Sequence, residues 1–275
     1  MRAENDRPGD EGVHPRHLRR ALWAIIALAL GLRLWGIGFG LPYDFTPDEI
    51  HEIMRALKLG AGEYDWDGFG KGGLYLILFV EYGFLYVFWR LTGHVGGAND
   101  FALQYLQDPT AFYLLGRVTV ALMGAGTCLV IYWIGKRLYG WRTGLVAAFL
   151  GATAYFHAAW SHYINVDTGM TLAVWASLLA YLKFEETDQS KWLAASGALI
   201  GIAVAFKLPG LAVVVPLGLA AVTPLSKWSN PMRPLRVLAI GAASFVIALV
   251  VVAPESVRNV PSVLGYFTQL IQPGD

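Results

Sequence analysis

Residues 43–75 read YDFTPDEIHEIMRALKLGAGEYDWDGFGKGGLY and form the polar stretch that follows the first hydrophobic segment. Asp48 and Glu49 come directly after Pro47 at the start of a helical pattern, and Lys71 lies in a glycine-rich turn before the next apolar run. Almost all of the remaining chain is compatible with a hydrocarbon environment. Because ionisable residues held at a membrane mark candidate functional sites, we look for the chemistry of the protein in this stretch.

The composition predicts an integral membrane protein. Charged residues make up 15% of the 275 residues and hydrophobic residues 56%, and the mean hydropathy is +0.48, whereas about a quarter of a typical soluble domain is charged. Cys128 is the only cysteine, which excludes a disulfide framework and a thiolate metal site. We expect membrane lipids around the protein and no nucleic-acid partner.

Apolar segments of about 17–25 residues predict the membrane spans. Residues 1–20 are polar and are predicted to be a disordered cytoplasmic tail. Ala21–Leu41 is predicted to be an uncleaved anchor, because Arg33 and Trp35 stand where a signal peptide requires small residues. The further spans are predicted near Gly116–Gly135, Thr143–Trp160, Asp167–Phe184, Trp192–Phe206, Leu208–Val222 and Val237–Ala253.

The segment Leu74–Trp89 is also apolar enough to span, but a spanning helix here conflicts with the distribution of positive charge. Cytoplasmic loops carry the excess of Lys and Arg. If the segment lies along the outer surface, six later basic residues fall on the cytoplasmic side with the N-terminal arginines, namely Lys136, Arg137, Arg142, Lys227, Arg233 and Arg236. Four aromatic residues share one helical face of the segment, as expected at the headgroup level: Tyr75, Tyr82, Tyr86 and Trp89.

We therefore predict an all-α integral membrane protein with seven spans, its N-terminus in the cytoplasm and its C-terminus outside. The multi-span module covers residues 21–253. Its first extracytoplasmic loop, residues 42–115, is expected to carry membrane-parallel helices. Residues 254–275 are predicted to form an extracytoplasmic tail, the start of a region that a longer sequence or a partner chain supplies.

Three carboxylates fall near predicted helix starts on the outer side. Asp48 and Glu49 complement a helix dipole in the first turn, and Asp167 is suited to an N-cap. The functional alternative is a general base that orients or deprotonates an acceptor hydroxyl, and both roles stay open at this point. His162 is a candidate hydrogen-bond donor or ligand. Asp48, Asp167 and His162 are of the types that bind a divalent cation such as Mg²⁺ or Mn²⁺, although their spacing does not require one.

Three cations fall on the same side as these carboxylates. The glycines around Lys71 in GFGKGGLY let backbone N–H groups approach a ligand, and a lysine in such a turn suits a phosphate. Snorkelling towards lipid headgroups is the alternative. Lys207 lies at the outer end of its span, against the charge rule, and Arg117 opens the second span from outside. This set of charges suits a lipid phosphate that carries a sugar.

The order and spacing of these motifs resemble the GT-C fold glycosyltransferases that use polyprenyl-phosphate sugars, in particular the superfamily of protein O-mannosyltransferases and aminoarabinose transferases. The resemblance covers Leu32–Leu270 and rests on four stretches: GLRLWGIGFGLPYDFTPDE, GKGGLY, GRVTVALMGAGTCLVIYWIGKRLYG and AAFLGATAYFHAAWSHYINVDTGM. It implies a GT-C-like fold whose outward first loop carries membrane-parallel helices.

The resemblance also implies roles for individual residues. Asp48 would be the principal catalytic carboxylate with Glu49 beside it, and Asp167 a second carboxylate of the site. Lys71 would contact the phosphate of the donor lipid. His51 stands where some relatives have a further phosphate-binding arginine, so it is included as a weaker candidate for the donor-phosphate site.

The leading hypothesis is a membrane glycosyltransferase of a bacterial or archaeal plasma membrane. It would move a sugar from a polyprenyl-phosphate donor to a protein, lipid or glycan acceptor at the extracytoplasmic face. A transporter or flippase of lipid-linked solutes requires paired ionisable residues and broken helices at the midplane, which the predicted spans hardly offer. A third hypothesis is a non-catalytic subunit that binds lipid or a partner chain. Proteins that the sequence resembles are usually longer than 275 residues, which favours this hypothesis, whereas the presence of both Asp48 and Asp167 argues against it.

Overall fold

The computed structural model describes residues 15–43, 46–64, 72–222 and 232–254, together with residues 258, 261 and 265. Every regular element in these ranges is helical, which confirms the predicted all-α class. The elements are α1 (Pro15–Leu34), α2 (Pro47–Gly60), α3 (Gly72–Leu91), α4 (Ala98–Gln107), α5 (Thr110–Tyr139), α6 (Trp141–Thr153), α7 (Tyr155–Trp160), α8 (Val166–Thr187), α9 (Ser190–Phe206), the 3-10 helix η1 (Leu208–Val213), α10 (Val214–Val222) and α11 (Arg233–Val252).

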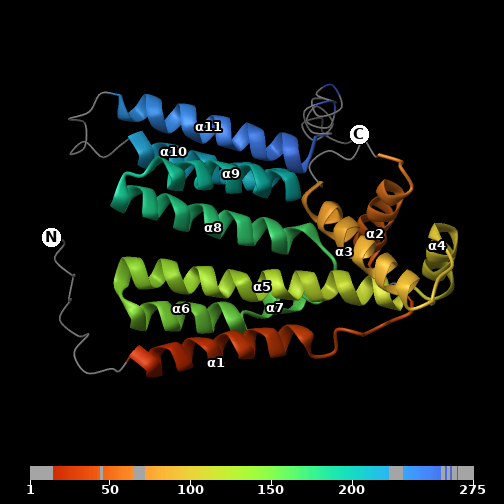
Figure 1. Cartoon of the computed structure of the whole chain (residues 1–275). Helices are drawn as coiled ribbons and strands as arrows, with labels where there is room; N and C mark the ends of the chain where they lie inside the picture. Colours follow the sequence, from red (N-terminus) through yellow and green to blue (C-terminus); the bar gives the residue numbers. More distant parts are fainter. Residues whose placement is uncertain are drawn as a thin grey trace, which may run out of the picture.

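The long helices run along a common axis in two packed groups (Figure 1). In the first group α1 packs against α5 and α6, and in the second α9 packs against α8 and α11. Contacts between α5 and α8 join the two groups. Each group has an apolar core of its own, in keeping with a helical membrane bundle.

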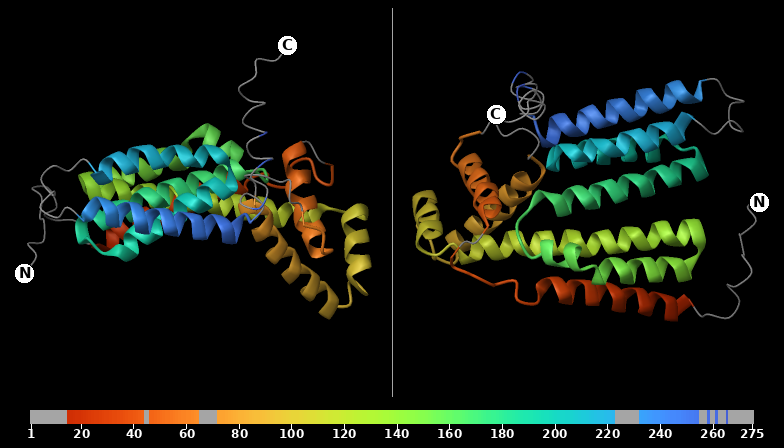
Figure 2. Two further views of the ribbon diagram at one scale, coloured as in Figure 1. Left: turned by 90° about the horizontal axis from the view of Figure 1, so that it is seen from above. Right: turned by 180° about the vertical axis from the view of Figure 1, so that it is seen from behind.

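Helices α2, α3 and α4 lie together at one end of the bundle, which we call the loop end (Figure 2). By length and composition α3, α5 and α11 are each able to cross a membrane. Whereas α5 and α11 follow the bundle axis, α3 runs obliquely at the loop end. The placement of α3 along the membrane surface, the seven-span topology and the domain limits stay predictions.

The aromatic face of α3 does not point to lipid as the sequence suggested. Tyr75 and Tyr82 are each only 3% exposed, and the Tyr82 hydroxyl donates to the carbonyl oxygen of Phe112 at 3.1 Å. Trp89 packs on the ring of Phe101. The prediction of a headgroup-level belt was therefore wrong for this face, because α2, α4 and the start of α5 cover it with protein.

The opposite end of the bundle, which we call the basic end, gathers the positive charge. The start of α1, the α5–α6 connection and the start of α11 all lie at this end (Figure 1). They carry Arg16, Arg19, Arg20, Lys136, Arg137, Arg142, Arg233 and Arg236. Arg233 pairs with Glu185 at 2.6 Å, and further pairs join Arg137 to Glu186 and Arg236 to Asp188.

Two glycines let α9 approach α11 closely. A Cβ atom added at Gly197 would collide with the carbonyl oxygen of Gly241, and one added at Gly201 would collide with that of Phe245. Gly197 and Gly201 are four residues apart, the spacing that brings helix backbones together in membranes. Van der Waals contact between these backbones therefore holds the second group together.

We predict that Gly197→Ala lowers the melting temperature of the detergent-solubilised protein. The added methyl group forces the two helices apart, and overpacking of this kind costs about 1–3 kcal/mol. Gly241→Ala is the matched control in the same interface, because a Cβ atom at Gly241 meets nothing within 4 Å. The control should be neutral or slightly stabilising, and equal melting temperatures for both variants would contradict the packing.

Candidate active site

A buried ion pair between Glu49 and Arg117 organises the loop end. Glu49 lies in the first turn of α2 and is fully buried, and Arg117 lies in the second turn of α5 and is 1% exposed. The guanidinium binds the carboxylate in a bidentate fork, Nε to Oε1 at 2.8 Å and Nη2 to Oε2 at 2.8 Å. Such planar pairs are the strong, geometrically specific form of ion pair.

Both partners also hold the backbone of neighbouring segments. Arg117 Nη1 donates to the carbonyl oxygens of Ile37 at 2.8 Å and Phe39 at 2.9 Å. Glu49 Oε1 accepts from the backbone N–H of Ile164 at 2.9 Å, and Glu49 Oε2 accepts from the Thr46 hydroxyl at 2.6 Å. The pair therefore fixes the chain after α1, the start of α2 and the entry to α8 around the start of α5.

This geometry gives Glu49 and Arg117 a structural part in the site. Four hydrogen bonds to protein acceptors occupy the Arg117 guanidinium, and the rings of Tyr113 and Tyr163 lie 5.5 and 5.8 Å from its central carbon. A cation engaged in this way has little left to offer a phosphate. The sequence suggested Arg117 as a donor-phosphate ligand, and the structure instead shows it bound to Glu49.

Asp48 differs from its neighbour in being exposed at the start of α2. Its carboxylate makes no hydrogen bond or ion pair with the rest of the described chain, whereas that of Glu49 is fully engaged. Because Glu49 binds the N–H of Ile164, three residues before Asp167, the starts of α2 and α8 lie at the same end of the bundle. His51 is also exposed on α2.

Asp167 and Lys207 form the second ionic element of the loop end. Lys207 Nζ donates to Asp167 Oδ1 at 2.8 Å, and both side chains stay about two-fifths exposed. Asp167 lies in the first turn of α8, whose N-cap Asn165 accepts from the N–H of Thr168 at 3.0 Å. Lys207 follows the last residue of α9. An accessible pair of this kind has both a carboxylate and an ammonium group available to a ligand.

Phe206, the residue before Lys207, packs against α8 and α3. Its ring lies against Gly169 of α8 and Gly73 of α3, so closely that a Cβ atom at Gly169 would collide with it and one at Gly73 would lie 3.0 Å from it. The absence of a side chain at Gly73 thus makes room for this ring. Lys71 itself lies outside the described residues.

The contacts of His162 bear on its predicted role as a metal ligand. His162 Nδ1 lies 2.9 Å from the carbonyl oxygen of Ala158, and Nε2 lies 3.1 Å from that of Trp35. Both ring nitrogens therefore face protein acceptors. Within the described ranges no three His, Cys, Asp or Glu side chains gather into a possible metal site, so Asp48, Asp167 and His162 do not form one there.

Two cavities at the loop end border these residues. One of about 230 Å3 is bordered by Arg117, His162 and Tyr163. The other, of about 360 Å3, is lined by Phe156, His157, Trp160, Asp167, Thr168 and Thr171. The second lies within the range of small-molecule sites, about 300–1,000 Å3, and combines aromatic with polar side chains.

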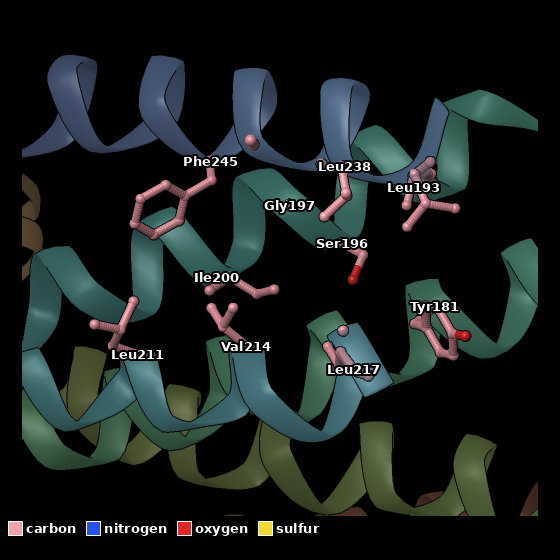
Figure 3. A pocket seen from close by; sticks show the side chains of 14 residues that line it. Tyr181, Leu193, Ser196, Gly197, Ile200, Leu211, Val214, Leu217, Leu238 and Phe245 are labelled. Atoms are coloured by element: carbon pink, nitrogen blue, oxygen red, sulfur yellow. The ribbon is translucent and has the colours of Figure 1, made fainter. Parts of the chain in front are cut away.

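A third cavity lies between α8, α9, α10 and α11 and is almost wholly apolar (Figure 3). Its polar side chains already have acceptors, since Ser196 donates to the carbonyl oxygen of Ser177 at 3.0 Å and Tyr181 to Glu185 at 2.9 Å. This lining suits hydrocarbon and offers no group for acid–base chemistry. We therefore place the candidate active site at the loop end.

Sequence reasoning missed Arg33 and His157. Arg33 is fully buried in the last turn of α1, and its Nη2 donates to Nδ1 of His157 at 2.6 Å. The signal was present, because an arginine within a predicted span is costly and is normally held by specific partners. In the sequence analysis Arg33 was used only as evidence against a signal peptide.

A helical bundle with long apolar helices and an ionic site at one end defines a polytopic membrane protein. The family model of the dolichyl-phosphate-mannose-protein mannosyltransferases matches residues 114–256, more than half of the chain, and the protein belongs to this family of GT-C type. The match includes Arg117, His162, Asp167 and Lys207 and begins after α2. None of the curated proteins and none of the solved structures matches the chain.

We predict that Glu49→Gln destabilises the fold strongly. The change leaves the Arg117 charge buried without its carboxylate, and breaking a buried ion pair on one side costs about 3–5 kcal/mol. Thermal unfolding in detergent measures the effect. Glu186→Gln is the control, because its exposed pair with Arg137 is worth about 0–1 kcal/mol, and similar losses for both variants would contradict the structural role.

Proposed function

We propose that the protein transfers a sugar from a polyprenyl-phosphate donor to a hydroxyl acceptor at the loop end of the bundle. The family is one of membrane glycosyltransferases, and its name gives mannose as the sugar and protein as the acceptor. The observation that carries the proposal is the exposed Asp48 beside the buried Glu49–Arg117 pair. Among the described residues this leaves one carboxylate free at the end that also holds Asp167 and Lys207.

In the proposed reaction Asp48 orients the acceptor hydroxyl and takes its proton. The acceptor oxygen attacks the anomeric carbon of the sugar from the face opposite to the lipid phosphate. The new glycosidic bond forms as the bond from the anomeric carbon to the phosphate oxygen breaks, and polyprenyl phosphate leaves with that electron pair. A positioned general base of this kind contributes about 10²- to 10⁴-fold to the rate.

Cations stabilise the phosphate as its charge develops. Lys207 is the described residue best suited to this part, because its ammonium group is two-fifths exposed and already next to Asp167. Lys71 and His51 complete the proposed donor-phosphate site. Arg117 contributes at a distance, by holding the start of α2. No step of the proposed reaction requires a divalent cation.

The charge distribution supports a cytoplasmic basic end and an extracytoplasmic loop end. Positive residues near the ends of spans favour the cytoplasmic side, and they gather at the start of α1, at the α5–α6 connection and at the start of α11. In this orientation the N-terminus is cytoplasmic. The donor sugar would then be used on the outer side, by a plasma-membrane enzyme.

We expect Asp48→Asn to reduce turnover by about 10²- to 10⁴-fold while the protein is made and folded normally, because the amide cannot accept the proton. The assay follows transfer of radiolabelled mannose from polyprenyl-phosphate mannose in membranes that contain the protein. Expression and melting temperature are measured on the same samples. Wild-type rates in a well-folded Asp48→Asn protein would exclude Asp48 as the base.

Asp100→Asn is the matched control for this experiment. Asp100 is likewise an exposed aspartate in the first turn of a loop-end helix, and it accepts from the N–H of Gly96 at 2.9 Å. Its loss removes the same charge from a helix start without touching the proposed site. The control should therefore keep wild-type turnover, and a comparable loss in both variants would point to helix capping.

The orientation is tested by labelling one introduced cysteine at a time with a membrane-impermeant maleimide. Asn99→Cys places a thiol on exposed α4 at the loop end, and Thr143→Cys places one at the basic end. Native Cys128 is fully buried and should not react. We expect Asn99→Cys to be labelled in intact cells and Thr143→Cys only after permeabilisation, and the reverse pattern would overturn the orientation.

A further inference from the structure

Arg33 is a buried cation whose partners are not carboxylates. It is fully buried near the loop end of α1, and no acidic side chain of the described chain forms an ion pair with it. Its Nη1 donates to the carbonyl oxygens of Ala29 at 2.9 Å and Ala152 at 3.2 Å. Its Nη2 donates to that of Gly151 at 3.3 Å.

Two of these carbonyl groups belong to the last turn of α6. The helix ends at Thr153, and Ala154 adopts an extended conformation before α7 begins. The last carbonyl groups of a helix lack intrahelical partners and carry the negative end of its dipole. Arg33 supplies donors and positive charge there, so it stabilises the break between α6 and α7.

The same guanidinium fixes the proton on the ring of His157. Arg33 Nη2 lies 2.6 Å from His157 Nδ1, and because a guanidinium only donates, Nδ1 must accept. The ring proton is therefore on Nε2. That nitrogen is buried and has no hydrogen-bond partner in the described part of the chain, which is unusual because an unsatisfied buried donor is costly.

His157 lines the cavity of about 360 Å3 that also borders Asp167. Phe156 and Trp160 give this cavity aromatic surface, while Thr168 and Thr171 add hydroxyl groups on the side of α8. Aromatic surface combined with a few hydrogen-bonding groups matches a pyranose ring, which has apolar C–H faces and a rim of hydroxyl groups. A phosphate would require a cation in this lining, and among the described lining residues there is none.

We propose that Arg33 holds His157 as a neutral Nε2–H donor for a hydroxyl oxygen of the sugar bound in this cavity. Arg33 is then a positioning residue and His157 a sugar-binding residue. The proposal rests on the transferase function, since it assigns the sugar of the donor to the cavity beside Asp167. It makes no change to the proton transfer assigned to Asp48.

The proposal is tested by nitrogen NMR on protein labelled with ¹⁵N-histidine. The signals of His157 are identified by their absence from the His157→Asn spectrum. We expect a neutral ring with its proton on Nε2, and a shift of the Nε2 signal when short-chain polyprenyl-phosphate mannose is added. A proton on Nδ1, a doubly protonated ring, or no shift with this lipid would overturn the proposal.

Polyprenyl phosphate without a sugar separates the two parts of the donor. It should leave the His157 signal in place, and an equal shift with the sugar-free lipid would assign the cavity to the phosphate and overturn the proposal. The readout does not depend on turnover. A protein that shows the sugar-dependent shift but no transfer would contradict the transferase function, while transfer without the shift would contradict the role of His157.

Two substitutions separate binding of the sugar from contact with Arg33. Asparagine places an acceptor near the position of Nδ1, so His157→Asn should keep the contact with Arg33. It lacks the Nε2–H donor, so the KM for the sugar donor should rise about fivefold to tenfold, as expected for the loss of one hydrogen bond. Glutamine places an N–H near the position of Nε2, so His157→Gln should keep KM closer to wild type and lower the melting temperature.

His94→Asn is the matched control, because this histidine is exposed in the connection between α3 and α4 and its ring packs on Trp89. It should keep the wild-type KM. The opposite pattern, with an unchanged KM in His157→Asn, would show that His157 acts only through the fold and would overturn the proposal.

Discussion

The loop end depends on the buried pair of Glu49 and Arg117. Four segments of the chain meet around these two side chains: the chain after α1, the start of α2, the start of α5 and the entry to α8. A buried ion pair adds little net stability, since its attraction is offset by desolvation. Its directional hydrogen bonds instead specify one arrangement of these segments. In this arrangement Asp48 is exposed, whereas the carboxylate of its neighbour Glu49 is fully hydrogen-bonded.

Arg33, a second buried cation, also holds distant segments together, but through different partners. Arg33 has no acidic partner among the described residues and binds the carbonyl groups at the end of α6, together with the ring of His157. One arginine thus recognises a carboxylate, the other the end of a helix dipole. Both arginines are almost fully buried and lie near the loop end, the end at which we place the candidate active site.

Much of the bundle could be predicted because hydrophobic length is a local property of the sequence. The prediction failed where distant residues decide the structure. Thr143–Trp160 reads as one apolar segment, yet it is divided at Ala154 into α6 and α7. No proline marks this break, and Arg33, which binds the last carbonyl groups of α6, lies more than a hundred residues earlier. The predicted first span, Ala21–Leu41, is likewise too long. Helix α1 ends at Leu34, before the carbonyl groups of Ile37 and Phe39 that Arg117 binds.

The same limit applies to the candidate site. The sequence identified Asp48, Glu49, Asp167, Arg117 and Lys207 as charges on one side, which follows from topology alone. It could not show that Arg117 is committed to Glu49, or that Lys207 is paired with Asp167. Pairing decides the chemistry, because a carboxylate that accepts four hydrogen bonds is a poor base, whereas Asp48, unpaired within the described chain, is a good candidate. Asp48 is therefore favoured over Glu49 for a reason that only the folded chain supplies.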